Sequence, residues 1–368
     1  MWRWSLDLRA MTTFPHASDY DSLVELLDDA AQRWPADRVM YGLRLDSGLA
    51  LAWSAQEMQR RSMLAAWRLR ALGLEAGDRL MTWSPSTPTL PAVYWGAMRA
   101  GIVVVPIDLR MTREVVERIA SIADTRWLAV DEGHGAPDPA EVGLEGMEIH
   151  KLADLTADPD EDWPEDWEAQ VRSWPQPGRD SLFEIHFTSG TTAAPKGVLL
   201  THGTFLASMS IFTDLFEVRH LRTISILPLS HLLEQIGTLF TGTMLGAEVI
   251  YVRNLRLISE VLPEVRVNAI VVTPQVLELV WNNLERRIDR TRVGPLYLRV
   301  ARRIAGHLPY RLRRLLFYPV HKPIGGALEL VLSAGSYLPP ELQIAWESLG
   351  IVVLQGYGLS LIHISEPT

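Results

Sequence analysis

Cysteine is absent from the 368-residue chain. Disulfide bonds, thiolate metal sites and a cysteine nucleophile are therefore excluded. Long apolar runs are absent as well, because the longest, at 102–106 and 351–354, have only the length of a strand. A membrane-spanning helix needs roughly 20 apolar residues, and residues 1–7 lack the apolar run of a signal peptide. We therefore expect a soluble, cytoplasmic protein.

An excess of positive charge is also missing. The chain has 35 Lys and Arg against 44 Asp and Glu, which gives a formal net charge of −9. Such a chain has no general attraction for nucleic acid, and this argues against DNA or RNA as a partner. Apolar residues make up 48% of the sequence, so the chain can bury large cores. Its length predicts two or more packed units.

Strand and helix patterns alternate along most of the chain. This alternation is typical of parallel βαβ units with helices on both faces of each sheet. A hairpin is predicted at 39–53, around Asp46-Ser47-Gly48. Further strands are predicted at 79–83, 102–105, 126–130, 184–188, 223–227, 248–252, 269–273, 328–333 and 352–355. The predicted fold class is therefore α/β, with two βαβ-type subdomains whose mostly parallel sheets are flanked by helices.

The expected domain division follows a change in composition. Residues 1–180 hold the first α/β subdomain and an acidic, proline-rich connection, residues 181–360 hold the second, and 361–368 form a separate tail. The connection at 131–179 interrupts the alternation, and we interpret it as a surface segment with short structure. It carries three scattered tryptophans, Trp163, Trp167 and Trp174.

A loop of small, polar residues follows the strand predicted at 184–188. It reads Phe187-Thr188-Ser189-Gly190-Thr191-Thr192-Ala193-Ala194-Pro195-Lys196-Gly197-Val198. Small residues let backbone amides approach an anion, and hydroxyls add donors. Lys196 adds a positive charge suited to phosphate oxygens. A plain serine- and threonine-rich loop explains the small residues but not the Pro-Lys-Gly that ends it. The spacing is not that of a Walker P-loop, because six residues separate Gly190 from Gly197 and the lysine precedes the second glycine.

A basic amphipathic stretch runs from Arg299 to Lys322, where cations alternate with apolar residues. One interpretation is a solvated helical face whose apolar residues pack inward. The other is contact with a nucleotide or with an anionic membrane surface. In the membrane case the cytoplasmic protein contacts the inner surface of the membrane peripherally.

The loop at 187–198 resembles the phosphate-binding signature of the AMP-binding, adenylate-forming superfamily, which includes acyl-CoA synthetases, luciferases and peptide-synthetase adenylation domains. Three further segments match in order, and the resemblance covers about residues 23–360. Leu227-Pro228-Leu229-Ser230-His231-Leu232-Leu233-Glu234-Gln235 resembles the second core motif, in the form common in long-chain acyl-CoA synthetases. Residues 333–339 resemble the loop that lines adenine, and 355–360 resemble the front of the next motif.

The resemblance implies an AMP-forming acid–thiol ligase. Such an enzyme uses ATP and Mg²⁺ to convert a carboxylic acid, here a medium- or long-chain fatty acid, to an acyl-adenylate and then to acyl-CoA with coenzyme A. It implies catalytic roles for Lys196, Thr192 and His231, with His231 bordering the acyl pocket. Without the motif, His231 at a helix start would more often be structural. The implied nucleotide contacts are Thr188, Ser189, Gly190, Thr191, Thr192, Lys196, Gly335, Ser336, Gln355, Gly356, Tyr357, Gly358 and Ser360.

The chain departs from the family pattern in three places. Ala193 stands where the family commonly has Gly, and Leu361 stands where it usually has a magnesium-binding Glu. The family's C-terminal lid domain, with its adenylation lysine, has no counterpart in the sequence. We therefore expect a partial chain that adenylates poorly by itself, which robust turnover of the 368-residue product would contradict. The alternatives are a non-catalytic relative that binds nucleotide or acyl chains, and an interaction module at the membrane surface.

Overall fold

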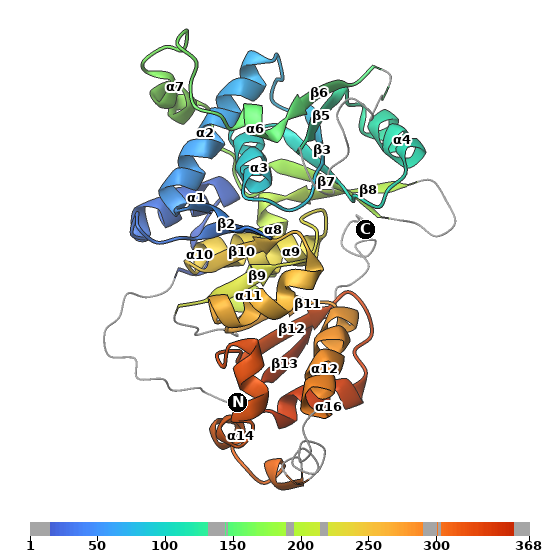
Figure 1. Cartoon of the computed structure of the whole chain (residues 1–368). Helices are drawn as coiled ribbons and strands as arrows, with labels where there is room; N and C mark the ends of the chain where they lie inside the picture. Colours follow the sequence, from blue (N-terminus) through green and yellow to red (C-terminus); the bar gives the residue numbers. More distant parts are fainter. Residues whose placement is uncertain are drawn as a thin grey trace.

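The computed structural model describes residues 15–131, 144, 146–188, 195–213, 220–289, 300 and 303–356. Three sheets follow one another from the top to the bottom of Figure 1. The first has the strand order β6 (Glu148–Lys151), β5 (Trp127–Val130), β3 (Arg79–Trp83), β4 (Val103–Ile107), β7 (Leu182–Thr188) and β8 (Lys196–Thr201). The second has the order β2 (Gly48–Trp53), β1 (Tyr41–Leu45), β10 (Glu248–Val252) and β9 (Arg222–Ser225). The third has the order β11 (Ala269–Val272), β12 (Leu330–Ala334) and β13 (Val352–Gly356).

Helices cover these sheets, which confirms the predicted α/β class. Those of the first part are α1 (Leu23–Arg33), α2 (Ala55–Ala71), α3 (Thr89–Arg99), α4 (Arg113–Ala123), α6 (Leu152–Leu155), α7 (Trp167–Ser173) and α8 (His202–Thr213). A continuous helical segment follows, made of α9 (Leu232–Glu234), the π-helical turn η2 (Gln235–Phe240) and α10 (Thr241–Met244). The remaining helices are α11 (Ile258–Val265), α12 (Pro274–Asp289), α14 (Tyr310–Leu316), α15 (Tyr318–His321) and α16 (Pro340–Ser348). Single 3-10 turns occur at Ala17–Asp19, Leu255–Leu257 and Lys322–Ile324.

The pairings within the sheets are parallel except in the hairpins β1–β2 and β7–β8. The hairpin expected at 39–53 is present, but it joins the second sheet through β10. Conversely, β7 and β8 follow residue 180 and yet extend the first sheet next to β4. The expected boundary at residue 180 therefore does not coincide with the division between the sheets. Strand β8 was not predicted.

An aromatic cluster joins the first and second sheets. Phe240 of η2 lies 5.5 Å from Trp95 of α3 and 5.5 Å from Phe205 of α8, edge to face in both pairs. Phe183 of β7 lies 4.7 Å from Phe205, and all four side chains are almost fully buried. Each such pair adds about 0.5–1.5 kcal/mol beyond area burial. The segment α9–η2–α10 is thus fixed against the first sheet although it covers strands of the second.

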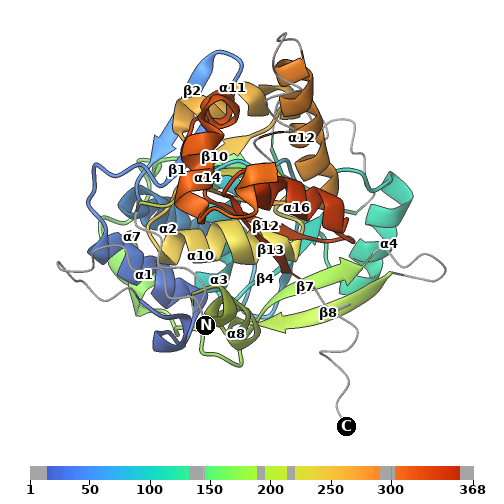
Figure 2. The ribbon, with the colours of Figure 1, turned by 90° about the horizontal axis from the view of Figure 1, so that it is seen from below.

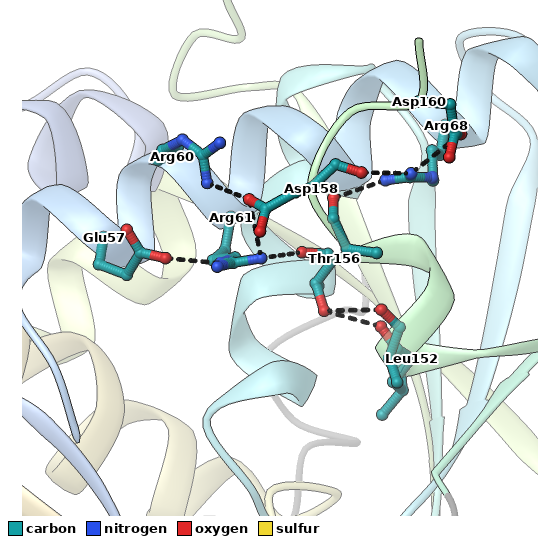
Figure 3. A network of polar contacts seen from close by, with 10 residues as sticks. Glu57, Arg60, Arg61, Arg68, Leu152, Thr156, Asp158 and Asp160 are labelled. Carbon is teal, nitrogen blue, oxygen red and sulfur yellow. Dashed lines mark hydrogen bonds and ion pairs between the residues drawn. The ribbon is translucent and has the colours of Figure 1, made fainter. Parts of the chain in front are cut away.

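The predicted surface connection lies as a strap over α2 (Figure 3). Arg60 donates to the Asp158 carboxylate at 2.6 Å, and Arg61 lies 3.4 Å from the same group. Arg68 donates to the Asp158 carbonyl at 2.9 Å and contacts the Asp160 carboxylate at 3.2 Å. Since backbone carbonyls as well as carboxylates accept these bonds, the strap is held along its length.

The tryptophans of the connection are not scattered in space. The Trp163 ring lies 5.6 Å from Trp67 of α2, with the Arg68 guanidinium 4.7 Å from its centre. Trp174 stacks on Trp67 at 6.5 Å, and Trp167 packs edge to face on Trp163 at 5.3 Å. The strap is therefore anchored by packing and cation–π contacts in addition to its ion pairs.

The basic stretch at 299–322 lies partly outside the described residues. In the described part, Arg313 donates to the carbonyls of Leu308 at 2.8 Å and Glu347 at 3.1 Å. Arg314 donates to the Gly326 carbonyl at 2.9 Å. These two arginines are committed to backbone oxygens, as the structural interpretation of the stretch expects. Viewed from below, α14 and α16 lie over the third sheet (Figure 2). No helix in the described ranges combines the length and apolar character needed to cross a membrane.

Gly96 marks the closest approach of α2 and α3. A Cβ at this position would lie 2.6 Å from the Ala65 Cβ, 2.7 Å from the Ser62 carbonyl oxygen and 2.9 Å from the Ala66 amide nitrogen. Two of these atoms belong to the backbone and cannot move aside without shifting a helix. We predict that Gly96→Ala lowers the free energy of unfolding by about 1–3 kcal/mol through overpacking, even though alanine is the better helix former by about 1 kcal/mol. Urea unfolding measures this loss.

Gly178→Ala is the matched control, because nothing lies within 4 Å of a Cβ at that position. It should leave the urea midpoint almost unchanged. A Gly96→Ala protein as stable as the control would show that the two helices are not in tight contact.

Candidate active site

Functional side chains gather at the carboxyl ends of parallel strands, where ligands bind in open α/β sheets. Strand β4 ends just before Asp108, and β9 leads into the loop 227–231. Strand β12 ends at Ala334, next to Gly335, and β13 ends at Gly356. Three of the four segments with family resemblance therefore begin at one edge of the second and third sheets.

Residues of both sheets hold the loop that carries His231. Ser86, between β3 and α3, donates to the Leu227 carbonyl at 3.3 Å and accepts from the Leu229 amide at 2.9 Å. From the other side, the buried Gln235 amide donates to the Leu229 carbonyl at 2.8 Å. The loop thus has a fixed path before any ligand binds. It places His231 at the N-cap of α9, with 42% of its side chain exposed.

Asp108 reaches His231 from the first sheet. One carboxylate oxygen, Oδ2, lies 3.0 Å from His231 Nε2. The Arg110 guanidinium binds the same carboxylate in a bidentate way, at 2.9 and 2.6 Å, and the Arg110 amide donates to it at 2.8 Å. Burial alone would raise the pKa of Asp108, but the bonds from Arg110 and His231 outweigh it and hold that pKa well below its usual range. Asp108 is therefore a charged acceptor at the edge of the site.

The predicted adenine loop begins with a glycine in the left-handed region. Gly335 has a φ of +90°, and the nearest atom to a Cβ built there is Thr273 Cγ2 at 3.7 Å. The open side of this glycine leaves room for a flat group to approach the backbone. Ser336 and the Gln275 amide group at the start of α12 lie 3.0 Å apart and are hydrogen-bonded. The loop is thus held by α12 and left open above Gly335.

Lys196 begins β8, directly opposite Thr188 at the end of β7. The antiparallel pairing puts this lysine at the same edge as the carboxyl ends of the parallel strands, and it is exposed there. Within the described ranges, no hydrogen bond or ion pair joins Lys196 to His231 or Gly335. The remaining predicted phosphate and adenine contacts lie outside the described residues: Ser189, Gly190, Thr191, Thr192, Tyr357, Gly358 and Ser360, together with Leu361.

Glu234 is a fully buried carboxyl three residues after His231. Neither of its oxygens makes a well-formed hydrogen bond to the described residues. The Ser225 and Thr238 hydroxyls and the Leu227 amide face it and offset part of the effect of burial, which nonetheless raises the pKa of Glu234 to about 8. Glu234 is therefore protonated and neutral at neutral pH.

The described residues do not offer a metal site. They contain no group of three or more His, Asp or Glu side chains that could hold an ion. The position of the family's magnesium-binding Glu is Leu361, which lies outside them. The part of the site that the structure describes therefore fits a nucleotide and an acid better than it fits Mg²⁺.

The family model described as AMP-binding enzyme matches residues 27–360. The chain belongs to this family of AMP-binding enzymes. The match runs from α1 to the last of the motif residues, in agreement with the resemblance found at 23–360. The fold and the order of the motifs are thus those of an AMP-binding enzyme.

Curated relatives and solved structures agree with this assignment. The chain is 27% identical over 204 residues to long chain acyl-CoA synthetase 1 of Arabidopsis thaliana, which covers 49% of this chain and 30% of that protein. It is 25% identical over 302 residues to the long-chain-fatty-acid–CoA ligase FadD13 of Mycobacterium tuberculosis, which covers 79% and 52%. The inhibitor-bound N-terminal domain of FACL13 from Mycobacterium tuberculosis aligns with a TM-score of 0.68 at 19% identity, covering 93% of this chain and 76% of that domain. The chain thus spans at most about half the length of these two curated relatives.

Asp108, Arg110, Ser86 and Glu234 were not predicted as site residues of this AMP-binding enzyme. Asp108 carried a usable signal, because a charged residue directly after a buried parallel strand stands where such sheets bind ligands. Ser86 carried none, since its role depends on a loop more than 140 positions away. Glu234 was read only as part of its motif.

The ionisation of Glu234 gives stability a defined pH dependence. In the unfolded chain its pKa returns to about 4.5, whereas in the fold it is about 8. Between these values folding takes up a proton, so the free energy of unfolding falls as pH rises, by up to about 1.4 kcal/mol per pH unit. We predict that Glu234→Gln, which cannot ionise, removes this slope and gains stability relative to the wild type towards pH 8. Urea unfolding between pH 5 and 8 measures both curves.

Glu278→Gln serves as the control, because Glu278 is exposed on α12. Its curve should run parallel to that of the wild type. If the Glu234→Gln curve is also parallel, the Glu234 carboxyl is not neutral in the fold.

Proposed function

We propose that this AMP-binding enzyme activates a carboxylic acid with ATP. The acid forms an acyl-adenylate, and coenzyme A then takes the acyl group and releases AMP. The observation that carries the proposal is the placement of the His231 loop, the Gly335 loop and Lys196 at one edge of the sheets, in the order typical of the family.

The nucleotide is proposed to lie across the carboxyl ends of β12 and β13. The open, left-handed Gly335 supports an adenine there, because a flat base needs close approach to the backbone. Lys196 supports the β- and γ-phosphates, since an exposed ammonium group is a good partner for phosphate oxygens. Thr188, Ser189, Gly190, Thr191 and Thr192 are proposed to complete this contact.

The acid is proposed to be a medium- or long-chain fatty acid whose tail runs beneath the His231 loop. An apolar cluster of Leu227, Val271 and Leu332, with Leu233 and Leu354 packed against it, adjoins this loop. A small cavity of about 40 Å³ continues it along Gly237, Val271 and Leu332. A Cβ at Gly237 would lie 3.2 Å from Val271 Cγ2, so the glycine keeps this slot open. An apolar slot supports an apolar tail.

The chemistry asks for positioning more than for proton transfer. In the first step the acid's carboxylate oxygen bonds to the α-phosphorus of ATP while the bond to pyrophosphate breaks. A carboxylate is already a nucleophile, so no base is needed, and alignment supplies much of the rate. In the second step the thiol sulfur of coenzyme A bonds to the acyl carbon and AMP leaves. Mg²⁺, when bound, neutralises phosphate charge, and the described residues are assigned no step through it.

Two other functions stay as alternatives. A non-catalytic relative would bind nucleotide or acyl chains without turnover. A peripheral membrane contact finds support in Leu312, Leu315 and Tyr318, which are exposed on α14 and α15 at 48%, 73% and 59%. The arginines 313 and 314 contribute little to such a contact, because their side chains bind backbone carbonyls.

Titration calorimetry tests the proposal. We predict that the chain binds ATP, and that it binds a non-hydrolysable long-chain acyl-adenylate analogue more tightly than the acetyl analogue. Lys196→Ala should weaken ATP binding about tenfold or more, which is the scale of a charged hydrogen bond. It should leave the affinity for the acyl-adenylate analogue unchanged, because that molecule has no β- or γ-phosphate.

Lys322→Ala is the matched control, since it removes an exposed lysine remote from this edge of the sheets. Equal ATP affinity for the Lys196→Ala protein and the wild type would make Lys196 a plain surface residue. A chain that binds neither ATP nor the analogues would exclude acid activation.

A further inference from the structure

Asp108 and His231 make a contact that the fold does not require for the path of the chain. The loop 227–231 is already bound to the first sheet by Ser86, which contacts both Leu227 and Leu229. Gln235 holds the same loop from within its own helix. The bond to Asp108 acts beyond these, on the imidazole ring alone. What it adds is therefore the orientation of the ring.

The direction of this bond follows from the donors around one oxygen. Arg110 Nη2 lies 2.6 Å from Asp108 Oδ2 and 3.2 Å from His231 Nε2. Arginine has no lone pair to offer, so it can only donate. If it donated to Nε2, the ring's lone pair would face the carboxylate oxygen at 3.0 Å, which is repulsive. The consistent arrangement is that His231 Nε2–H and Arg110 both donate to Oδ2, and their mutual distance follows from the shared acceptor.

We propose that Asp108 is a positioning residue for His231: it accepts the Nε2 proton, locks the ring, and leaves Nδ1 to face the acid site. The neutral ring then carries its lone pair on Nδ1. The Asp108 side chain is only 10% exposed, so water competes weakly for this bond. Arg110, which is 77% exposed, holds the carboxylate in place from the solvent side. The value of a locked ring for the reaction rests on the proposed acid activation.

The geometry gives the acid site a division of labour between sheets. The second sheet supplies His231, and the first supplies the group that orients it. A shift of the two sheets relative to each other would therefore alter the ring before it altered the loop, which Ser86 and Gln235 hold. Asp108 acts through His231 and is not expected to touch the acid.

Nitrogen-15 NMR of the histidine rings tests the orientation on the 368-residue chain, without substrate. His231→Gln identifies the His231 resonances. We predict an Nε2–H tautomer with a slowly exchanging ring proton. Asp108→Asn keeps an acceptor oxygen but loses its charge, so it should keep the tautomer with faster proton exchange. Asp108→Ala should lose the slow proton and give a mixture of tautomers.

Asp124→Asn is the matched control. Asp124 also binds an arginine, Arg79, at 2.7 Å, but on the opposite side of the first sheet and 92% exposed. This variant should leave the His231 resonances unchanged, and circular dichroism checks that every variant folds. If Asp108→Ala does not fold, the change between the wild type and Asp108→Asn decides the orientation by itself.

A second readout connects the ring to the acid. Asp108→Ala should weaken binding of the acyl-adenylate analogue about tenfold, while ATP binding stays within about twofold because the nucleotide does not meet the ring. The proposal is overturned if the wild-type ring carries its proton on Nδ1, if the Asp108 variants leave the resonances unchanged, or if the ring changes and the analogue binds as before. A wild type that binds no analogue would remove the proposed function, and the ring resonances would still decide whether Asp108 orients His231.

Discussion

The helical segment α9–η2–α10 is clamped between two sheets, and the rest of the site depends on this clamp. Phe240 packs among aromatic side chains of α3 and α8, which belong to the first part of the chain. At the other end of the segment, Ser86 and Asp108 bind the loop before α9. Because aromatic packing and directional hydrogen bonds act on the same short segment, it has little freedom to slide. The π-helical turn at 235–240 absorbs the mismatch between the two ends, as such turns often do near functional sites.

This clamp explains how distant strands can form one site. The first sheet contributes Asp108 and Lys196, the second contributes His231, and the third contributes Gly335. Each follows from the same rule, that the carboxyl ends of parallel strands share one edge. Buried polar groups such as Glu234 then lie in a region that water does not reach, and their protonation adjusts to it. The site is thus a product of packing between sheets as much as of its own motifs.

Local sequence patterns predict the strands well and the contacts between sheets poorly. Strand β10 was expected at 248–252 and lies at Glu248–Val252, because a buried β-branched run is bounded by Gly246 and Asn254. Strand β8 was missed, since its only pairing is the hairpin with β7 and its residues alternate around an exposed Leu199. The bond network of Arg110 and His231 joins residues 121 positions apart. No local pattern encodes such a contact, and only the assembled sheets bring the two together.

Amide hydrogen exchange, followed peptide by peptide in the presence of a long-chain acyl-adenylate analogue, tests most directly whether one ligand is held by all three sheets. The account predicts slower exchange at 108–110, 227–235 and 333–336 together, because these segments end strands of different sheets around a single site. Slower exchange in segments of one sheet alone, or no change at all, would contradict it.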